Sequence, residues 1–289
     1  MSGFDRQTRP SDSAMIRFWQ RIPLVIRAIV LGIFVSTIGV YAWLAIGTLI
    51  PGLWAIVVMG GVLWLYWKYF SGSWWPESTA EARRNSFRTL KMSAAVRKWS
   101  LVAAMLIVVI WQSGMVLTFR IIEFPTEAFT AGYNLEAIPL WLAWLMVIMS
   151  SLVAGICEET GYRGYMQAPL EERYSPGVAI TIVSIMFLVI HLQQVWAPPV
   201  PFHLFALSVL LGILACASGS LIPGMIAHTS LDIFNFSYWW TDIAGTFERQ
   251  TIAETGIDNH FIAWFLISGA SIALFFWTIR KIMAVRQQR

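Results

Sequence analysis

Residues 28–67 read AIVLGIFVSTIGVYAWLAIGTLIPGLWAIVVMGGVLWLYW and contain no charged side chain. A helix crosses the hydrocarbon core of a bilayer with about 20 apolar residues, so this run is long enough for two crossings. The Pro51–Gly52 pair interrupts it, because neither residue favours a helix interior. We therefore predict two membrane spans here, from about Ala28 to Ile50 and from Leu53 to Phe70.

The composition of the whole chain also indicates a membrane protein. Of its 289 residues, 57% are hydrophobic and 12% are charged, against roughly 45–50% and about 25% in soluble domains. Such a chain lacks the polar surface of a soluble enzyme and is too apolar to be disordered. Two cysteines, Cys157 and Cys216, cannot form a disulfide framework.

Six further apolar runs are expected to be spans, which predicts an all-α, polytopic membrane protein of about eight transmembrane helices forming a helical bundle with a central cavity. These runs are Trp99–Phe119, Ile138 to about Cys157 or beyond, Val178–Trp196, Phe202–Ala217, Leu221–Trp240 and Phe261–Ile279.

The distribution of Lys and Arg predicts the orientation. If the N-terminus is cytoplasmic and the chain crosses eight times, only Arg120 and Arg249 among the basic residues fall outside. We therefore expect a multi-pass protein with both termini in the cytoplasm. The net charge of +4 then reflects membrane orientation and not nucleic-acid binding. The basic loop 71–98 is expected to contact anionic lipid headgroups.

Ionisable side chains inside predicted spans are costly to bury and usually functional. Glu159 and Arg163 are spaced i,i+4 with the acid first, which favours a helical ion pair. The adjacent Glu158 would then point about 100° away and be free for other work. Taken alone, this cluster is equally well explained as the charged cytoplasmic end of a span.

Two histidines lie on other predicted spans. His191 shares a helix face with Phe187, and a lone histidine in such a position is more often structural. His228 precedes Asp232 by four residues, so the Asp232 carboxylate can accept a hydrogen bond from a ring N–H and fix the tautomer. This pair could also be a simple contact between helices. Together, one carboxylate and two histidines on three spans indicate a hydrolytic site.

The three motifs, in order, resemble those of the CPBP family of intramembrane endopeptidases. That family includes the CAAX prenyl proteases of the Rce1 type and the bacterial abortive infection proteins. The motifs are Glu158-Glu159-x-x-x-Arg163, Phe187-x-x-x-His191 and His228-x-x-x-Asp232. The similarity covers about residues 155–236, under a third of the chain, and includes Gly219-Ser-Leu-Ile-Pro-Gly before His228.

The resemblance implies a catalytic site made of six residues: Glu158, Glu159, Arg163, His191, His228 and Asp232. Glu158 would activate the attacking water, and His191 and His228 would stabilise the oxyanion. Glu159 and Arg163 match the supporting pair of the family. Asp232 stands where many members have asparagine, so an amide contact with the oxyanion is not assumed here.

The resemblance also implies the reaction partners and the compartment. The substrate would be a membrane protein or a hydrophobic or lipidated peptide within the bilayer, and no nucleic acid is expected. We expect a bacterial plasma membrane. The domains would be a cytoplasmic segment 1–27, transmembrane helices 28–119 with the basic loop 71–98, a catalytic core 138–240 and a last helix with a basic tail, 261–289.

Three alternatives stay open from the sequence. A zinc-dependent protease could use Glu158 and the two histidines as ligands with Glu159 as base, although no His-Glu-x-x-His is present; we expect no obligatory cofactor. A non-enzymatic membrane immunity or scaffold protein could retain the fold. A transporter could use the same groups as a proton relay.

The depth of the motifs along their spans requires a long fourth helix. Glu158 lies about 30 Å from Ile138 along a helix, whereas His191 would lie deeper in the membrane. The two side chains can meet only if the fourth helix starts outside the bilayer and continues past Arg163, or if the fifth span starts below it. We predict a fourth helix that runs through about Leu170. We also expect a water-filled cavity open to the cytoplasm.

Overall fold

A computed structural model describes residues 18–19, 21–88, 92–126, 129, 138–192 and 199–287. This part of the chain is helical and contains no strand, which confirms the predicted all-α class. Six of its helices are long and apolar enough to cross a membrane, as expected for a multi-pass membrane protein. They are α2 (Leu24–Leu49), α3 (Leu53–Phe70), α5 (Ala94–Ile121), the helix Leu140–Glu171, α10 (Pro199–Ser218) and α13 (Asn259–Gln287).

The other two predicted spans form shorter helices. The expected span Val178–Trp196 corresponds to α9 (Pro176–Ile190), which has 15 residues; residues 193–198 lie outside the described part. The seventh span consists of α11 (Ile222–Phe234) and a π-helical turn, η4 (Asn235–Trp239). Three short elements complete the fold: η1 (Glu77–Thr79), α4 (Ala80–Phe87) and α12 (Ile252–Thr255).

The fourth span is one continuous helix in three sections. It consists of α7 (Leu140–Glu158), the π-helical section η2 (Glu159–Gln167) and α8 (Ala168–Glu171). This confirms the expectation that the helix extends to about Leu170. The π-helical section begins at the candidate motif, and such sections are frequent at functional sites.

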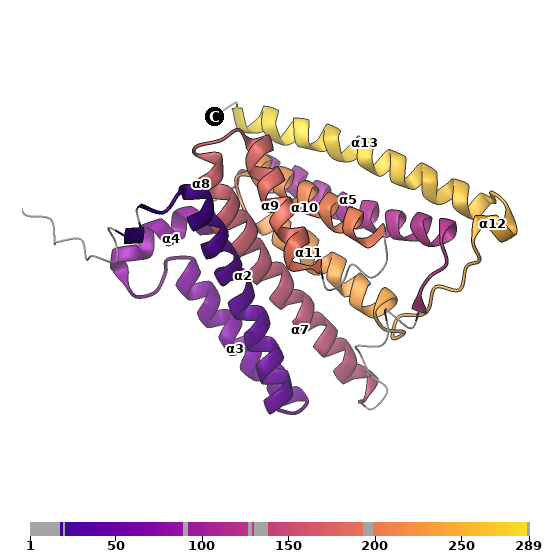
Figure 1. Ribbon diagram of the computed structural model, residues 1–289, viewed down its shortest axis with the longest axis horizontal. Coiled ribbons are helices and arrows are strands. Elements are labelled where there is room, and N and C mark those ends of the chain that lie inside the picture. The colour runs from indigo at the N-terminus through magenta and orange to yellow at the C-terminus, as the bar shows by residue number, and fades with distance from the viewer. Residues whose placement is uncertain are drawn as a thin grey trace, which may run out of the picture.

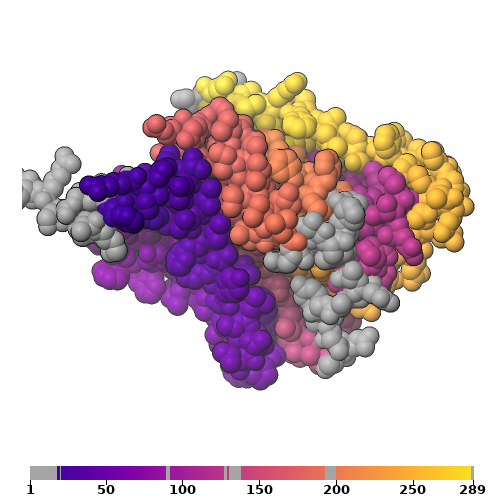
Figure 2. Space-filling view, in the orientation of Figure 1, coloured from indigo at the N-terminus to yellow at the C-terminus, as the bar shows by residue number. Residues whose placement is uncertain are grey.

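The helices converge at one end of the molecule. Figure 1 shows α4, α8 and the C-terminal end of α13 together there, whereas the α2–α3 turn and the start of α7 lie at the far end. We call the end that contains α4, α8 and the C-terminal end of α13 the basic end. It carries Arg84, Arg88, Arg280, Lys281 and Arg286. α2, α3 and α13 lie at the surface (Figure 2) and expose large apolar side chains such as Trp54 and Phe265. These are the faces expected to contact lipid.

Close helix crossings hold the long fourth span in place. At Gly161, α2 approaches η2 so closely that a Cβ atom would collide with the Gly32 carbonyl oxygen and lie 2.6 Å from the Ser36 backbone nitrogen. At Gly155, a Cβ atom would collide with the Thr229 hydroxyl on α11. Small residues allow such backbone contact between membrane helices.

The crossing at Gly161 can be tested by adding one methyl group. We expect Gly161→Ala to destabilise the fold by about 1–3 kcal/mol, because backbone atoms of α2 would have to move. Gly60→Ala, on the open face of α3, has no atom within 4 Å of the new Cβ and should leave stability unchanged or slightly higher. Thermal unfolding in detergent measures both; equal melting temperatures would contradict the close crossing.

A buried arginine ties α5 to α13 at the end opposite the basic end. The Arg120 side chain is 1% exposed and donates hydrogen bonds to Oδ1 and Oδ2 of Asp258 at 3.2 and 2.9 Å. Asp258 Oδ1 also accepts from the Phe261 backbone N–H at 2.8 Å, in the first turn of α13. The hydrogen bonds from Arg120 and then from Phe261 lower the pKa of Asp258 from 3.8 to about 2.

The lowered pKa of Asp258 gives a pH-dependent prediction. A carboxylate with a depressed folded-state pKa stabilises the fold above its unfolded pKa, and this contribution is lost as the pH falls through the folded value. We expect Asp258→Asn to lower the melting temperature at pH 7, with the difference from wild type shrinking between about pH 4 and pH 2. Asp242→Asn, at an exposed aspartate, is the control. A difference that is constant with pH would contradict the assignment.

Candidate active site

The six candidate residues converge at the centre of the bundle from three spans. Glu158 ends α7 and Glu159 begins η2. His191 follows the last residue of α9 as its C-cap, and His228 lies within α11. Because the fourth span and α11 cross closely at Gly155, one turn from Glu159, the side chains of both helices reach one another there.

Glu159 is fully buried and is shared by two cationic or protonatable partners. Its Oε1 accepts a hydrogen bond from Arg163 Nη1 at 2.9 Å, which is the ion pair that the i,i+4 spacing predicted. The same oxygen lies 2.9 Å from His228 Nδ1. Arg163 in turn donates from Nη2 to the carbonyl and hydroxyl oxygens of Ser208 on α10, at 3.1 and 3.0 Å. The carboxylate therefore connects three helices.

Glu159 is the carboxylate that orients His228. The sequence left open whether Asp232 fixes the ring; Asp232 Oδ2 lies 3.5 Å from His228 Nε2, in an ion-pair geometry. The hydrogen bond at Nδ1 is made to Glu159 instead. A carboxylate only accepts, so Nδ1 of His228 carries the proton.

His191 is also held through its Nδ1 atom, in this case by a carbonyl group of its own helix. Its Nδ1 lies 2.7 Å from the Phe187 carbonyl oxygen, which can only accept, so Nδ1 is again the donor. The imidazole also stacks on the Phe187 ring, with centroids 4.3 Å apart and planes 30° apart. Both histidines therefore turn Nε2 toward the same point.

That point is the Glu158 carboxylate. Glu158 Oε2 lies 3.9 Å from His191 Nε2 and 4.0 Å from His228 Nε2, and it has no hydrogen-bond partner among the described residues. These separations are too long for direct hydrogen bonds. A water placed between Glu158 Oε2 and either Nε2 atom would lie within hydrogen-bond distance of both. Glu158 is therefore brought within one-water reach of each of the two histidines.

A small cavity of about 100 Å³ adjoins this point. Its walls combine polar and charged side chains with apolar and aromatic ones. They include Trp111, Ala154, Glu158, Phe187, His191, Leu204, Leu207, His228, Leu231, Asp232, Asn235, Phe236 and Trp240. A cavity of this size and polarity accommodates ordered water.

The cavity extends away from the basic end. The fourth span ends at the basic end and α11 begins there, so Ala154 and Asn235 both lie farther from that end than Glu158 and His228. On the side of the basic end, Glu159 and Arg163 fill the interior and are fully buried. If the basic end is cytoplasmic, the cavity does not extend toward the cytoplasm as we expected.

The donor geometry does not fit a zinc site. Zinc ligands bound at about 2.1 Å in a tetrahedron lie about 3.4 Å apart, whereas Glu158 Oε2 is about 4 Å from both imidazoles. Within the described ranges, no group of three or more His, Cys, Asp or Glu side chains is arranged to hold a metal ion. Glu159, the base in the zinc alternative, is already bound by Arg163 and His228.

Sequence reasoning missed Ser208, which accepts hydrogen bonds from Arg163, and two further polar residues on the fourth span, Gln167 and Glu171. Gln167 Nε2 donates to the Gly212 carbonyl on α10 at 2.9 Å and to Glu171 Oε1 at 2.7 Å. Glu159, Arg163, Gln167 and Glu171 thus form a polar row with i,i+4 spacing along the fourth span. The repeated spacing was present in the sequence and could have indicated one polar helix face.

Comparison with known proteins agrees with the resemblance seen in the sequence. Residues 139–234 match the family described as type II CAAX prenyl endopeptidase Rce1-like. The match contains all six candidate residues and supports an intramembrane CAAX-type protease fold in this part of the chain. No curated protein and no solved structure gives a significant match.

Because Glu159 and Arg163 form a buried ion pair, we expect substitutions of these two residues to have strongly coupled effects on the free energy of unfolding. We expect Arg163→Met to destabilise the protein by about 3–5 kcal/mol, because it leaves a buried carboxylate without its cation. The double variant Arg163→Met/Glu159→Gln should recover part of this loss, since the unpaired charge is removed. Arg280→Met, at an exposed arginine, is the control. Denaturant unfolding measures all variants, and equal loss in the single and double variants would argue against the buried ion pair.

Proposed function

We propose that this protein is an intramembrane endopeptidase that hydrolyses a peptide bond in a membrane-associated protein or peptide, with Glu158 as general base. The observation that carries the proposal is the one-water gap between Glu158 Oε2 and the Nε2 atoms of His191 and His228. The family match of residues 139–234 supports a protease fold around it.

In the first step, Glu158 removes a proton from the bound water as the water oxygen attacks the scissile carbonyl carbon. The carboxylate is suited to this task because its Oε2 has no competing hydrogen bond within the described residues. A positioned carboxylate of this kind contributes about 10²–10⁴-fold to the rate. The carbonyl oxygen becomes an oxyanion in the tetrahedral intermediate.

The two imidazoles then stabilise the oxyanion. Because Nδ1 of each ring already donates to Phe187 or Glu159, an Nε2 donor requires the protonated imidazolium. Three carboxylates face one permanent cation, Arg163, so protonation of the histidines brings the net charge of the cluster closer to zero. A preorganised imidazolium N–H is a strong oxyanion donor.

Collapse of the intermediate completes the reaction. The C–N bond breaks as Glu158 returns its proton to the leaving amine nitrogen, so Glu158 ends as it began. The hydroxyl of the water stays on the acyl carbon and forms the new carboxylic acid. No redox partner or group donor is needed.

The surroundings of the site indicate the class of substrate. Its cavity lies between apolar spans and has aromatic and leucine walls. A hydrophobic or lipid-anchored peptide segment would reach a site with such surroundings from the bilayer more readily than a soluble peptide would. We therefore propose membrane proteins, or hydrophobic or lipidated peptides, as substrates.

A cleavage assay on candidate membrane substrates, with the purified chain in lipid nanodiscs, tests the proposal. We expect Glu158→Gln to lower the cleavage rate by about 10²–10⁴-fold and His228→Ala to lower it by about 10²–10³-fold. Glu254→Gln, at an exposed residue far along the chain, should cleave as wild type does.

Two outcomes of this assay would change the conclusion. Equal cleavage by wild type and Glu158→Gln would refute Glu158 as the base. Loss of wild-type activity on addition of a chelator, with recovery on adding zinc, would favour the metal-dependent route. We expect cleavage to be unaffected by chelation.

A further inference from the structure

Two adjoining cavities lie at the basic end, remote from the candidate active site. The first has a volume of about 480 Å³ and is lined largely by charged and polar residues. The second has a volume of about 580 Å³ and is lined mainly by apolar residues. They share Pro176, Cys216 and Arg286. The polar cavity and the apolar cavity therefore lie side by side, with Arg286 in the lining of both.

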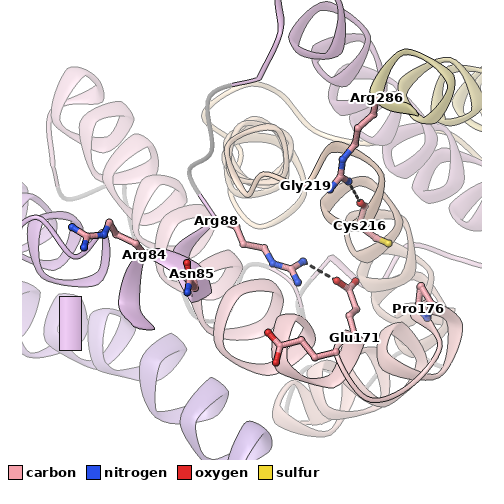
Figure 3. Close-up of a pocket in the computed structure, with 9 residues that line it drawn as sticks. Arg84, Asn85, Arg88, Glu171, Pro176, Cys216, Gly219 and Arg286 are labelled. Atoms are coloured by element: carbon pink, nitrogen blue, oxygen red, sulfur yellow. Dashed lines mark hydrogen bonds and ion pairs between the residues drawn. The ribbon is translucent and has the colours of Figure 1, made fainter. Parts of the chain in front are cut away.

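The polar cavity carries arginines that reach it from different helices. Arg88 and Arg286 extend into it from opposite sides, whereas the Arg84 side chain lies at its edge (Figure 3). Arg88 is paired with Glu171 at 2.7 Å. Arg286 Nη1 donates to the Cys216 and Ala217 carbonyl oxygens. Among the described residues, neither Arg84 nor Arg286 is within ion-pair distance of a carboxylate.

Arg286 is the arginine through which this cavity can bind an anion. Of its three arginines, Arg84 turns away toward the Gly72 carbonyl and Arg88 is paired with Glu171, so Arg286 is the one that faces the cavity without a carboxylate partner among the described residues. The cavity also lies at the start of α9, whose first residue, Pro176, forms part of the wall. The positive end of the α9 dipole faces the cavity there, whereas the negative ends of the fourth span and α10 lie beside Glu171 and Cys216, so the helix dipoles give no net preference for an anion.

The apolar cavity is a groove between α9, α10 and the last turns of α13. Its apolar lining includes Ile180, Ile213, Ala217, Ile279 and Met283. From Ile279 to Arg286 the groove follows about 10 Å of helix. This suits one end of a hydrocarbon chain running parallel to the helices.

The position of both cavities along the bundle matches a membrane surface. The fourth span ends at Glu171, α9 starts at Pro176, α10 ends at Ser218 and α13 ends at Gln287. All four helix ends lie beside these cavities. Charged residues then lie at the headgroup level, and the apolar groove lies at the level of the acyl chains.

We propose that the two cavities form one binding site for an anionic glycerophospholipid. The phosphate binds in the polar cavity between Arg286 and Arg88, and an acyl chain lies in the groove along α13. A lipid fits better than a free phosphate because the polar cavity adjoins an apolar one, with Arg286 in the lining of both. This site is separate from the proposed catalytic cavity, so its test does not depend on protease activity.

Native mass spectrometry of the full chain in a neutral detergent tests the proposal. We expect phosphatidylglycerol to bind at least about tenfold more tightly than phosphatidylcholine. Arg286→Gln should remove most of this preference. Met283→Trp, which fills the groove, should weaken the binding of both lipids. Arg280→Gln and Leu274→Trp are matched controls, since both residues are exposed on α13 outside the cavities.

Several results would overturn the site. Equal binding of the two lipids, or an equal loss in Arg280→Gln, would show that the arginine cavity does not select a lipid. Full competition by soluble glycerol 3-phosphate, with no effect of Met283→Trp, would indicate a simple anion site. Melting temperatures identify variants that do not fold. Arg84→Gln provides a second test if Arg286→Gln fails to fold, and it should lower phosphatidylglycerol affinity less than Arg286→Gln, because Arg84 lies at the cavity edge.

Discussion

The arrangement of the central helices depends on one buried carboxylate. Glu159 cannot be held inside a membrane bundle without compensation, because an unpaired buried charge is strongly unfavourable. Its Oε1 receives hydrogen bonds from Arg163 and His228, and Arg163 is itself fixed to Ser208. A Cβ at Gly224 would lie 2.9 Å from Glu159 Oε2, so α11 leaves room for the carboxylate only because that residue is glycine. These contacts set the relative positions of the fourth span, α10 and α11.

The same carboxylate explains how two adjacent glutamates come to differ. Glu159 is enclosed and paired, whereas Glu158 turns toward the cavity with an oxygen that has no hydrogen bond within the described residues. By engaging Nδ1 of His228, Glu159 directs the opposite ring nitrogen toward Glu158. The Phe187 carbonyl does the same for His191. Different environments for neighbouring carboxyl groups are a general means of separating catalytic roles, and the proposed chemistry relies on that separation.

The polar row on the fourth span links the two proposed sites. It starts at Glu159 beside the catalytic cavity and ends at Glu171, whose carboxylate pairs with Arg88 in the polar cavity at the basic end. Gln167 bridges the middle by hydrogen bonds to Glu171 and to the Gly212 carbonyl. Each side chain of the row makes at least one hydrogen bond or ion pair to a neighbour in the row or to α10, which offsets part of the cost of placing it in an apolar bundle. The row therefore also fixes how α10 packs against the fourth span.

The sequence alone determined the features that are local along the chain. Long apolar runs predicted the helices, i,i+4 spacing predicted the Glu159–Arg163 pair, and the three motifs identified the residues that meet at the candidate site. The tertiary structure alone decided that His228 is held by Glu159 and not by Asp232, that α9 is only 15 residues long, and that the cavity extends away from the basic end. Helical periodicity fixes only which residues share a face of one helix. Contacts between residues 69 positions apart depend on how closely helices cross, and that distance is set by small residues such as Gly155 against Thr229.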